Sequence, residues 1–171
     1  ESGSLKVNDK IKVLPSSHES TIKEIRIGEE LISEATYEQS VTLSLNDEID
    51  ISRGDMIVQK DDSLTSTKNF RANVCWLSES NLSVNRTYLI MHTTRLSKAK
   101  ISSINNKINI NTLDTEQANE LKTNDIANIS FKLAQPLIVD QYSQNRSTGA
   151  FIIIDETTYH TVGAGMIETI E

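Results

Sequence analysis

The sequence predicts an all-β protein, on the basis of its composition and its periodicity. Ile occurs 21 times and Thr 16 times among 171 residues, whereas Pro occurs twice and Gly six times. β-Branched side chains have few χ1 rotamers and suit a pleated strand better than a helix. In three segments apolar and polar residues also alternate strictly, which is the period of a half-buried strand. These segments are Val41–Leu45, Phe70–Trp76 and Ala127–Leu133.

Further strands are predicted where short apolar segments are separated by residues that favour tight turns. One short helix is predicted for Thr115–Leu121, with Thr115 as its N-cap. Strands this closely spaced favour an antiparallel barrel or sandwich over βαβ units. The turn residues are Asn8-Asp9, Pro15–Ser17, Asn46-Asp47, Asn105-Asn106 and Asn124-Asp125. The further strands are Lys10–Leu14, Lys23–Ile27, Met56–Gln59, Thr87–His92, Lys98–Ile104, Lys107–Ile110, Gly149–Ile154 and Thr161–Ile167.

A polar segment without periodicity, Asp61–Lys68, predicts a boundary between two domains. It divides the chain into about 60 and about 104 residues, which are reasonable sizes for one small and one larger β-domain. We therefore expect domains at residues 1–62 and 67–171.

Composition and charge exclude several classes of protein. The formal net charge is −7, because 17 Lys and Arg stand against 24 Asp and Glu. Such a chain is a poor nucleic-acid binder, since that affinity comes mostly from Lys and Arg on phosphates. No apolar run approaches the roughly 20 residues that a membrane helix needs, and the single Cys75 cannot form an internal disulfide. We expect a cytoplasmic protein with no nucleic-acid and no membrane partner.

The residues predict no catalytic, cofactor-binding or metal-binding constellation. The three histidines have no second ligand at a suitable spacing, and Cys75 has the context of a structural thiol. Asn106-Lys-Ile-Asn109 resembles the guanine-reading tetrapeptide of GTPases, but Asn109 stands where Asp is required, and the chain lacks a phosphate-binding loop. Arg53-Gly-Asp55 is most simply a tight turn, in which Gly54 supplies an unusual φ.

Several stretches resemble a known family. Residues 1–14 resemble a segment of the second domain of translation-factor GTPases, and Ile49–Val58 resembles the closing strand of that barrel. In the C-terminal third, three motifs follow one another: Ile110-Asn-Thr-Leu113, Asn145-Arg-Ser-Thr-Gly-Ala-Phe-Ile-Ile-Ile-Asp155 and Thr161-Val-Gly-Ala-Gly-Met-Ile167. Taken together they are similar to the GTPase subunit (subunit 1, the large subunit) of bacterial sulfate adenylyltransferase. The resemblance covers nearly the whole chain.

The resemblance implies two antiparallel β-barrels of the translation-factor domain II and domain III type. Residue 1 falls inside the first barrel, which is therefore expected to lack its opening strands. An incomplete barrel keeps an exposed edge, so we expect residues 1–60 to be less ordered than the rest or paired with a second copy. Residues 67–171 are expected to fold independently.

The resemblance also implies a function. In that family a GTPase domain precedes the barrels, and the protein pairs with a catalytic subunit (subunit 2) to make adenosine 5′-phosphosulfate from ATP and sulfate, driven by GTP hydrolysis. GTP, ATP and Mg²⁺ would belong to the parent enzyme, with no cofactor in this chain. The chain alone would be non-catalytic, a relay and interface between its own upstream GTPase domain and the catalytic subunit. The alternative is a pair of barrels that hold tRNA or another partner of a translation-factor-type GTPase, for which a basic surface is expected.

Five residues stand out as candidates for a structural or interface role. Asn145, Arg146 and Thr148 precede an apolar strand, and Arg146 is expected to bond turn carbonyls or a carboxylate with its five fixed donors. Gly163 and Gly165 alternate within a predicted strand. Because Gly weakens a strand, the pair predicts close approach by a neighbouring backbone or large side chain, leaving a smooth groove on that face.

Overall fold

The structure is a computed structural model that describes residues 2–62, 64, 66–84 and 86–171. All regular elements within these residues are β-strands, which confirms the all-β class. They are β1 (Leu5–Lys6), β2 (Lys10–Leu14), β3 (His18–Ile27), β4 (Glu30–Ile32), β5 (Glu34–Ala35), β6 (Thr42–Leu45), β7 (Met56–Gln59), β8 (Ser66–Trp76), β9 (Thr87–His92), β10 (Arg95–Ile108), β11 (Thr115–Glu116), β12 (Ile126–Ile138), β13 (Ala150–Asp155) and β14 (Thr161–Ile170). In this described part of the chain, no helix is long and apolar enough to span a bilayer.

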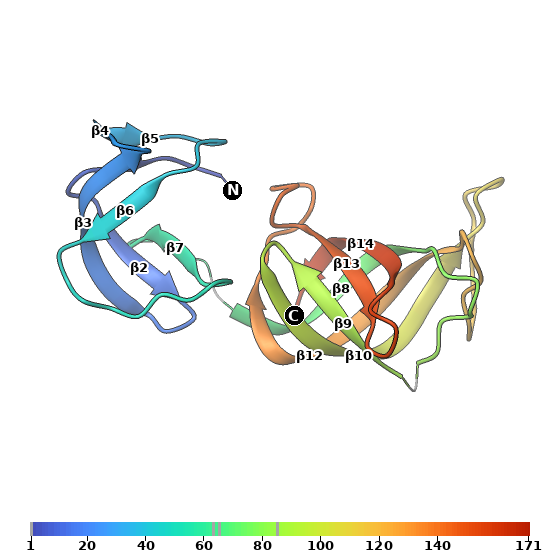
Figure 1. Cartoon of the computed structure of the whole chain (residues 1–171). Helices are drawn as coiled ribbons and strands as arrows, with labels where there is room; N and C mark the ends of the chain where they lie inside the picture. The colour runs from blue at the N-terminus through green and yellow to red at the C-terminus, as the bar shows by residue number, and fades with distance from the viewer. Residues whose placement is uncertain (1, 63, 65, 85) are drawn as a thin grey trace. The chain divides into compact units, whose positions relative to one another are not determined.

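The chain forms two compact units, residues 1–64 and 65–171. Residues 63 and 65 of the polar segment at Asp61–Lys68 lie outside the described residues. Each unit has its own sheets, as Figure 1 shows. Each also has its own cluster of buried apolar residues.

The first unit is a curled sheet with strand order β4-β3-β2-β7, in which β6 also pairs with β3; β1 and β5 form a separate two-stranded ribbon. The alternation of β2 places Ile11 and Val13 in the core, both fully buried. Among the strands described, β7 pairs only with β2, so this sheet does not close on itself. Apolar residues beside its core line a surface cavity of about 490 Å³: Val41, Leu43, Leu45, Ile49, Ile51 and Ile57.

The second unit is a closed barrel of six strands in the order β10-β12-β8-β14-β13-β9, and pairing between β9 and β10 completes the circle (Figure 1). The three phenylalanines of the chain meet inside it. The ring centroid of Phe70 lies 5.3 Å from those of Phe131 and Phe151, and the latter two lie 5.4 Å apart. Such contacts add to the gain from apolar burial.

Two expectations about local structure are wrong in this unit. The predicted helix at Thr115–Leu121 is absent: Thr115 and Glu116 instead pair with Ile108 and Lys107. A helix this short is marginal alone, whereas strand pairing satisfies the same backbone groups. Asn105-Asn106 lies within β10 and not in a turn, because the register against β12 shifts between Ile104 and Asn106. A β-bulge of this kind accommodates one extra residue in a strand.

Candidate functional site

The two strongest sequence motifs are neighbours in the barrel. They form β13 and β14, in which Phe151 lies opposite Gly165 and Ile153 lies opposite Gly163. The loop of residues 139–148 returns to the same hairpin, because the backbone N–H of Tyr142 donates to the carbonyl of β14 residue Ile167 at 2.8 Å. The structure therefore places all five candidate residues along one hairpin and the loop that precedes it.

Asp140 organises that loop, and the sequence interpretation missed it. Its carboxylate accepts hydrogen bonds from the hydroxyl of Thr148 and from Nδ2 of Asn145, the latter at 3.2 Å. Its own N–H donates to the carbonyl of Thr148 at 3.1 Å, and the buried His92 ring donates to the same carbonyl through Nε2 at 2.7 Å. Asn145 and Thr148 thus hold the loop closed. The only sequence signal for Asp140 is its place directly after the apolar run Leu137–Val139.

Gly149 is a second residue that the sequence interpretation passed over. A Cβ atom at this position would lie 2.6 Å from the carbonyl oxygen of Asn145 and 2.6 Å from the backbone nitrogen of Tyr142. Both obstacles are main-chain atoms, which cannot rotate away as a side chain can. Glycine at this position therefore allows the loop to pack against the start of β13.

Arg146 has a different position from the one expected. Its side chain is exposed, and its guanidinium carbon lies 6.0 Å from the centre of the Tyr142 ring, a cation–π contact. The turn bonds assigned to Arg146 come instead from Asn145 and Thr148. Arg146 is thus a solvent-facing cation whose stem is oriented by an aromatic ring.

Gly163 and Gly165 both lie inside the barrel, where the close approach expected from the sequence is present. A Cβ atom on Gly165 would lie 2.7 Å from Cε1 of Phe151, and one on Gly163 would lie 3.2 Å from the carbonyl oxygen of Cys75. The Phe151 ring fills the space over Gly165, so the smooth groove that the sequence suggested does not exist at that position.

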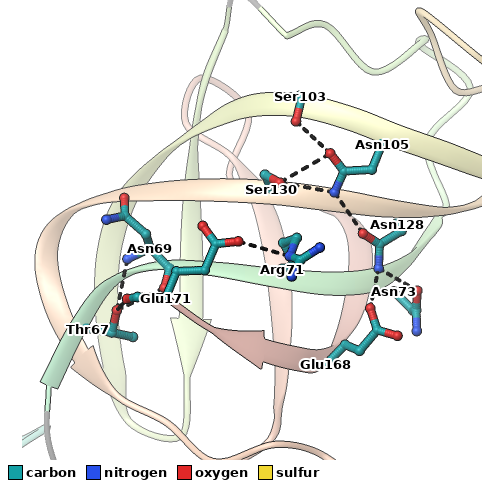
Figure 2. A network of polar contacts seen from close by, with 10 residues as sticks. All are labelled: Thr67, Asn69, Arg71, Asn73, Ser103, Asn105, Asn128, Ser130, Glu168 and Glu171. Carbon is teal, nitrogen blue, oxygen red and sulfur yellow. Dashed lines mark hydrogen bonds and ion pairs between the residues drawn. The ribbon is translucent and has the colours of Figure 1, made fainter.

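Polar side chains form a connected network across β10, β12, β8 and β14 (Figure 2). Asn105 lies at the bulge of β10 and donates from Nδ2 to Oδ1 of Asn128 at 2.8 Å and to the hydroxyl of Ser130 at 3.0 Å. Asn128, only 8% exposed, donates in turn to Asn73 at 3.0 Å and to Glu168 at 2.7 Å. The members satisfy one another, so this surface is preorganised.

Asp155 ends β13 and carries the clearest electrostatic perturbation of an acid in the described residues. Backbone N–H groups of Thr158, the largest influence, and of Thr157 donate to Oδ1 at 2.9 Å each, and Arg86 pairs with Oδ2 at 2.6 Å. These contacts lower the pKa of Asp155 below its ordinary value although burial of the carboxyl opposes them. Asp155 therefore stays ionised and fixes the turn after β13.

Within the residues that the structure describes, no group of three or more His, Cys, Asp or Glu side chains is arranged to hold a metal ion. The geometry around β13 and β14 instead provides a rigid loop, an exposed arginine and a preorganised polar face.

A family model and a solved structure identify the class of protein to which the chain belongs. The model of the GTP-eEF1A C-terminal domain-like family matches residues 69–168, more than half of the chain, and the chain belongs to this family. The crystal structure of Sup35 complexed with GMPPNP has the same fold, with a TM-score of 0.89 at 17% identity over 99% of this chain and 42% of that one. The sequence interpretation as barrels of the translation-factor type is confirmed.

The more similar relatives confirm the particular resemblance. Sulfate adenylyltransferase subunit 1 of Psychromonas ingrahamii is 45% identical over 166 residues, and that of Shewanella woodyi is 44% identical over 166 residues. The protein of the same name from Francisella tularensis is 45% identical. In each case the match covers 97% of this chain and 35% of the relative, so the chain spans about a third of the length of these relatives.

Proposed function

We propose that this chain is the non-catalytic C-terminal part of the GTP-hydrolysing subunit of a sulfate adenylyltransferase. In this role it serves as relay and interface between a GTPase domain and the catalytic subunit, in the cytoplasm. The observation that carries the proposal is identity of up to 45% over 97% of the chain to proteins named subunit 1 of that enzyme. The preorganised polar face and the rigid loop before β13 are compatible with a protein partner.

The nucleotide chemistry is assigned to the parent enzyme. GTP, ATP and Mg²⁺ would act in the GTPase domain and the catalytic subunit, because the sequence of this chain has no phosphate-binding loop to cradle phosphates. We expect the purified chain to hydrolyse no GTP and to form no adenosine 5′-phosphosulfate. Single-turnover assays with highly purified chain test this, and reproducible GTP hydrolysis that co-purifies with the chain would contradict it.

The interface role is tested with the catalytic subunit of a sulfate adenylyltransferase from the same organism. We expect the chain to form a stoichiometric complex in isothermal titration calorimetry and to co-elute with that subunit in size-exclusion chromatography. Absence of binding at micromolar concentrations would refute the interface role.

The same samples test the alternative, which is a tRNA-holding pair of barrels. The net charge of −7 disfavours it, since tRNA binding depends on cations against phosphates. We expect no retention of tRNA in a filter-binding assay at 150 mM salt. Retention of tRNA together with failure to bind the catalytic subunit would favour the alternative.

A further inference from the structure

Two four-residue loops of the second unit have the same hydrogen-bond pattern. In the first, the N–H of Leu113 donates to the carbonyl of Asn109 at 2.7 Å, and the N–H groups of Asn111 and Thr112 donate to Oδ1 of Asn109 at 3.0 and 3.4 Å. The N–H of Asn109 donates to the carbonyl of Asp114 at 2.9 Å, which closes the loop. The first loop is thus held rigidly at the tip of the hairpin of β10 and β11, which extends from the barrel in Figure 1.

The second loop follows β13 and repeats these bonds. The N–H of Tyr159 donates to the carbonyl of Asp155 at 2.9 Å, Thr157 and Thr158 donate to its Oδ1, and the N–H of Asp155 donates to His160 at 2.9 Å. Leu113 and Tyr159 therefore occupy equivalent positions in two copies of one turn.

That position requires a left-handed backbone, which favours Gly or Asn. Leu113 has φ +63° and Tyr159 has φ +58°. A bulky side chain is strained in this conformation. Both side chains are also exposed, Leu113 by 77% and Tyr159 by 72%. The left-handed backbone is thus a property of the shared turn, and at position 113 this turn presents an apolar side chain to solvent.

The two loops differ in the residue that follows the Asn or Asp whose side chain accepts the turn hydrogen bonds, Asn109 in the first loop and Asp155 in the second. In the second loop this residue is Glu156, which forms an ion pair with Lys98 of the barrel wall. In the first loop it is Ile110, whose side chain is 64% exposed. The second loop is thus tied to its own barrel, whereas the first displays two apolar side chains, Ile110 and Leu113, at the end of a projecting hairpin.

The surroundings of the first loop carry negative charge. Residues 108–121 contain Asp114, Glu116 and Glu120 and no Lys or Arg. Lys107, just before them, is shared between Glu116 at 3.6 Å and Asp125 at 3.0 Å, so it offsets part of the charge on two carboxylates. The apolar tip is therefore followed directly in the chain by an acidic segment, whose charge a cationic surface would complement.

We propose that Ile110 and Leu113 form a docking knob that inserts into an apolar pocket bordered by Lys or Arg on the catalytic subunit. This inference rests on the proposed function for its choice of partner. The rigid loop lowers the entropy cost of docking, and two aliphatic side chains at the centre of a contact are suited to exclude water from it.

The test compares three variants of the whole chain with the wild type. Leu113→Asn removes the apolar side chain and places at the left-handed position a residue that accepts it. Tyr159→Asn is the matched control, because it makes the same change in the equivalent turn. Asp114→Asn removes one carboxylate beside the knob. Binding to the purified catalytic subunit is measured by calorimetry at 50 and 300 mM NaCl, and the melting temperature is measured for each variant.

We expect Leu113→Asn to weaken binding at least about tenfold while its melting temperature stays equal to or above that of the wild type. Tyr159→Asn should raise or preserve the melting temperature with unchanged affinity. Wild-type affinity should fall at the higher salt concentration, and Asp114→Asn should reduce that salt dependence.

Three results would contradict all or part of the inference, and they can be told apart. If Leu113→Asn binds the catalytic subunit as tightly as the wild type does, the docking knob is refuted and the proposed function is unaffected. If the wild-type chain fails to bind the catalytic subunit, both the docking knob and the proposed interface function are refuted. Binding that is lost in Leu113→Asn but insensitive to salt and to Asp114→Asn would refute the cationic border of the pocket.

Discussion

The packing of Phe151 against Gly165 accounts for one residue in each of the two motifs at residues 145–155 and 161–167. The two residues lie opposite each other in adjacent strands, and the phenylalanine ring occupies the volume that a larger residue at position 165 would need. The same ring packs against Phe70 and Phe131 in the centre of the barrel. The large ring of Phe151 therefore requires glycine at position 165, and packing alone accounts for both residues without a catalytic role.

Gly165→Ala should destabilise the second unit more than Gly163→Ala does. The added methyl at position 165 meets a ring that is packed against two other rings, so relief requires a shift of the core, at a cost of about 1–3 kcal/mol. At position 163 the nearest atoms are 3.2 Å away, which a small shift accommodates. Urea denaturation of the three proteins measures the difference, and equal midpoints would contradict this explanation.

Asp155 should make stability depend on pH in the acid range. Its pKa is lowered in the folded protein, so its stabilising contribution is complete above the ordinary Asp value of about 3.9. The contribution is lost as the pH falls further through the lowered folded pKa. The gap in unfolding free energy between wild type and Asp155→Asn should therefore narrow between pH 6 and pH 2.5. A gap that stays constant across this range would show that the carboxylate charge contributes nothing.

At the scale of elements, the bulge in β10 positions a polar side chain to bond with the neighbouring strand. The extra residue lets the Asn105 side chain reach both Asn128 and Ser130 of the adjacent strand. Strands β8 and β14 contribute Asn73 and Glu168 to the same network. A feature of one strand thereby organises side chains on four strands.

Asn128→Ala should destabilise the barrel by about 1–3 kcal/mol, because the buried Asn128 would lose its hydrogen bonds and the half-buried Asn105 and Asn73 would each lose a partner. Asn69→Ala is the control, since that side chain is exposed on β8. Thermal denaturation of both variants, with wild type alongside, decides the matter. If the two substitutions have the same small effect on the melting temperature, the network does not contribute to the stability of the barrel.

At the scale of the whole molecule, the two units differ in the means of their stability. In the described residues the core of the first unit contains five buried apolar residues, Ile11, Val13, Ile22, Ile25 and Ala35, whereas twenty form that of the second. The first sheet remains open among the described strands, and the second closes into a barrel without edges. A smaller core and an open edge both predict easier opening.

Residues 66–171 should therefore fold alone with a single cooperative transition, whose midpoint lies close to that of the same unit in the whole chain. Amide hydrogen exchange should be faster throughout residues 5–60 than in β8, β12 and β14. Circular dichroism of the isolated unit and exchange mass spectrometry of the whole chain provide the two measurements. Uniformly slow exchange of residues 5–60 in a monomeric sample would contradict the expectation.

The sequence by itself determined the positions of most strands, since alternation in segments such as Phe70–Trp76 is a local property of a half-buried strand. It also determined the family, because the motifs around Thr148 and Gly165 can be read without coordinates. Only the tertiary structure decided that Asn105 lies in a bulge, that Thr115 pairs in a strand, and that Asp140 closes a loop which Arg146 does not bond. These features depend on contacts between residues far apart in the chain, and local propensity is too weak to specify such contacts.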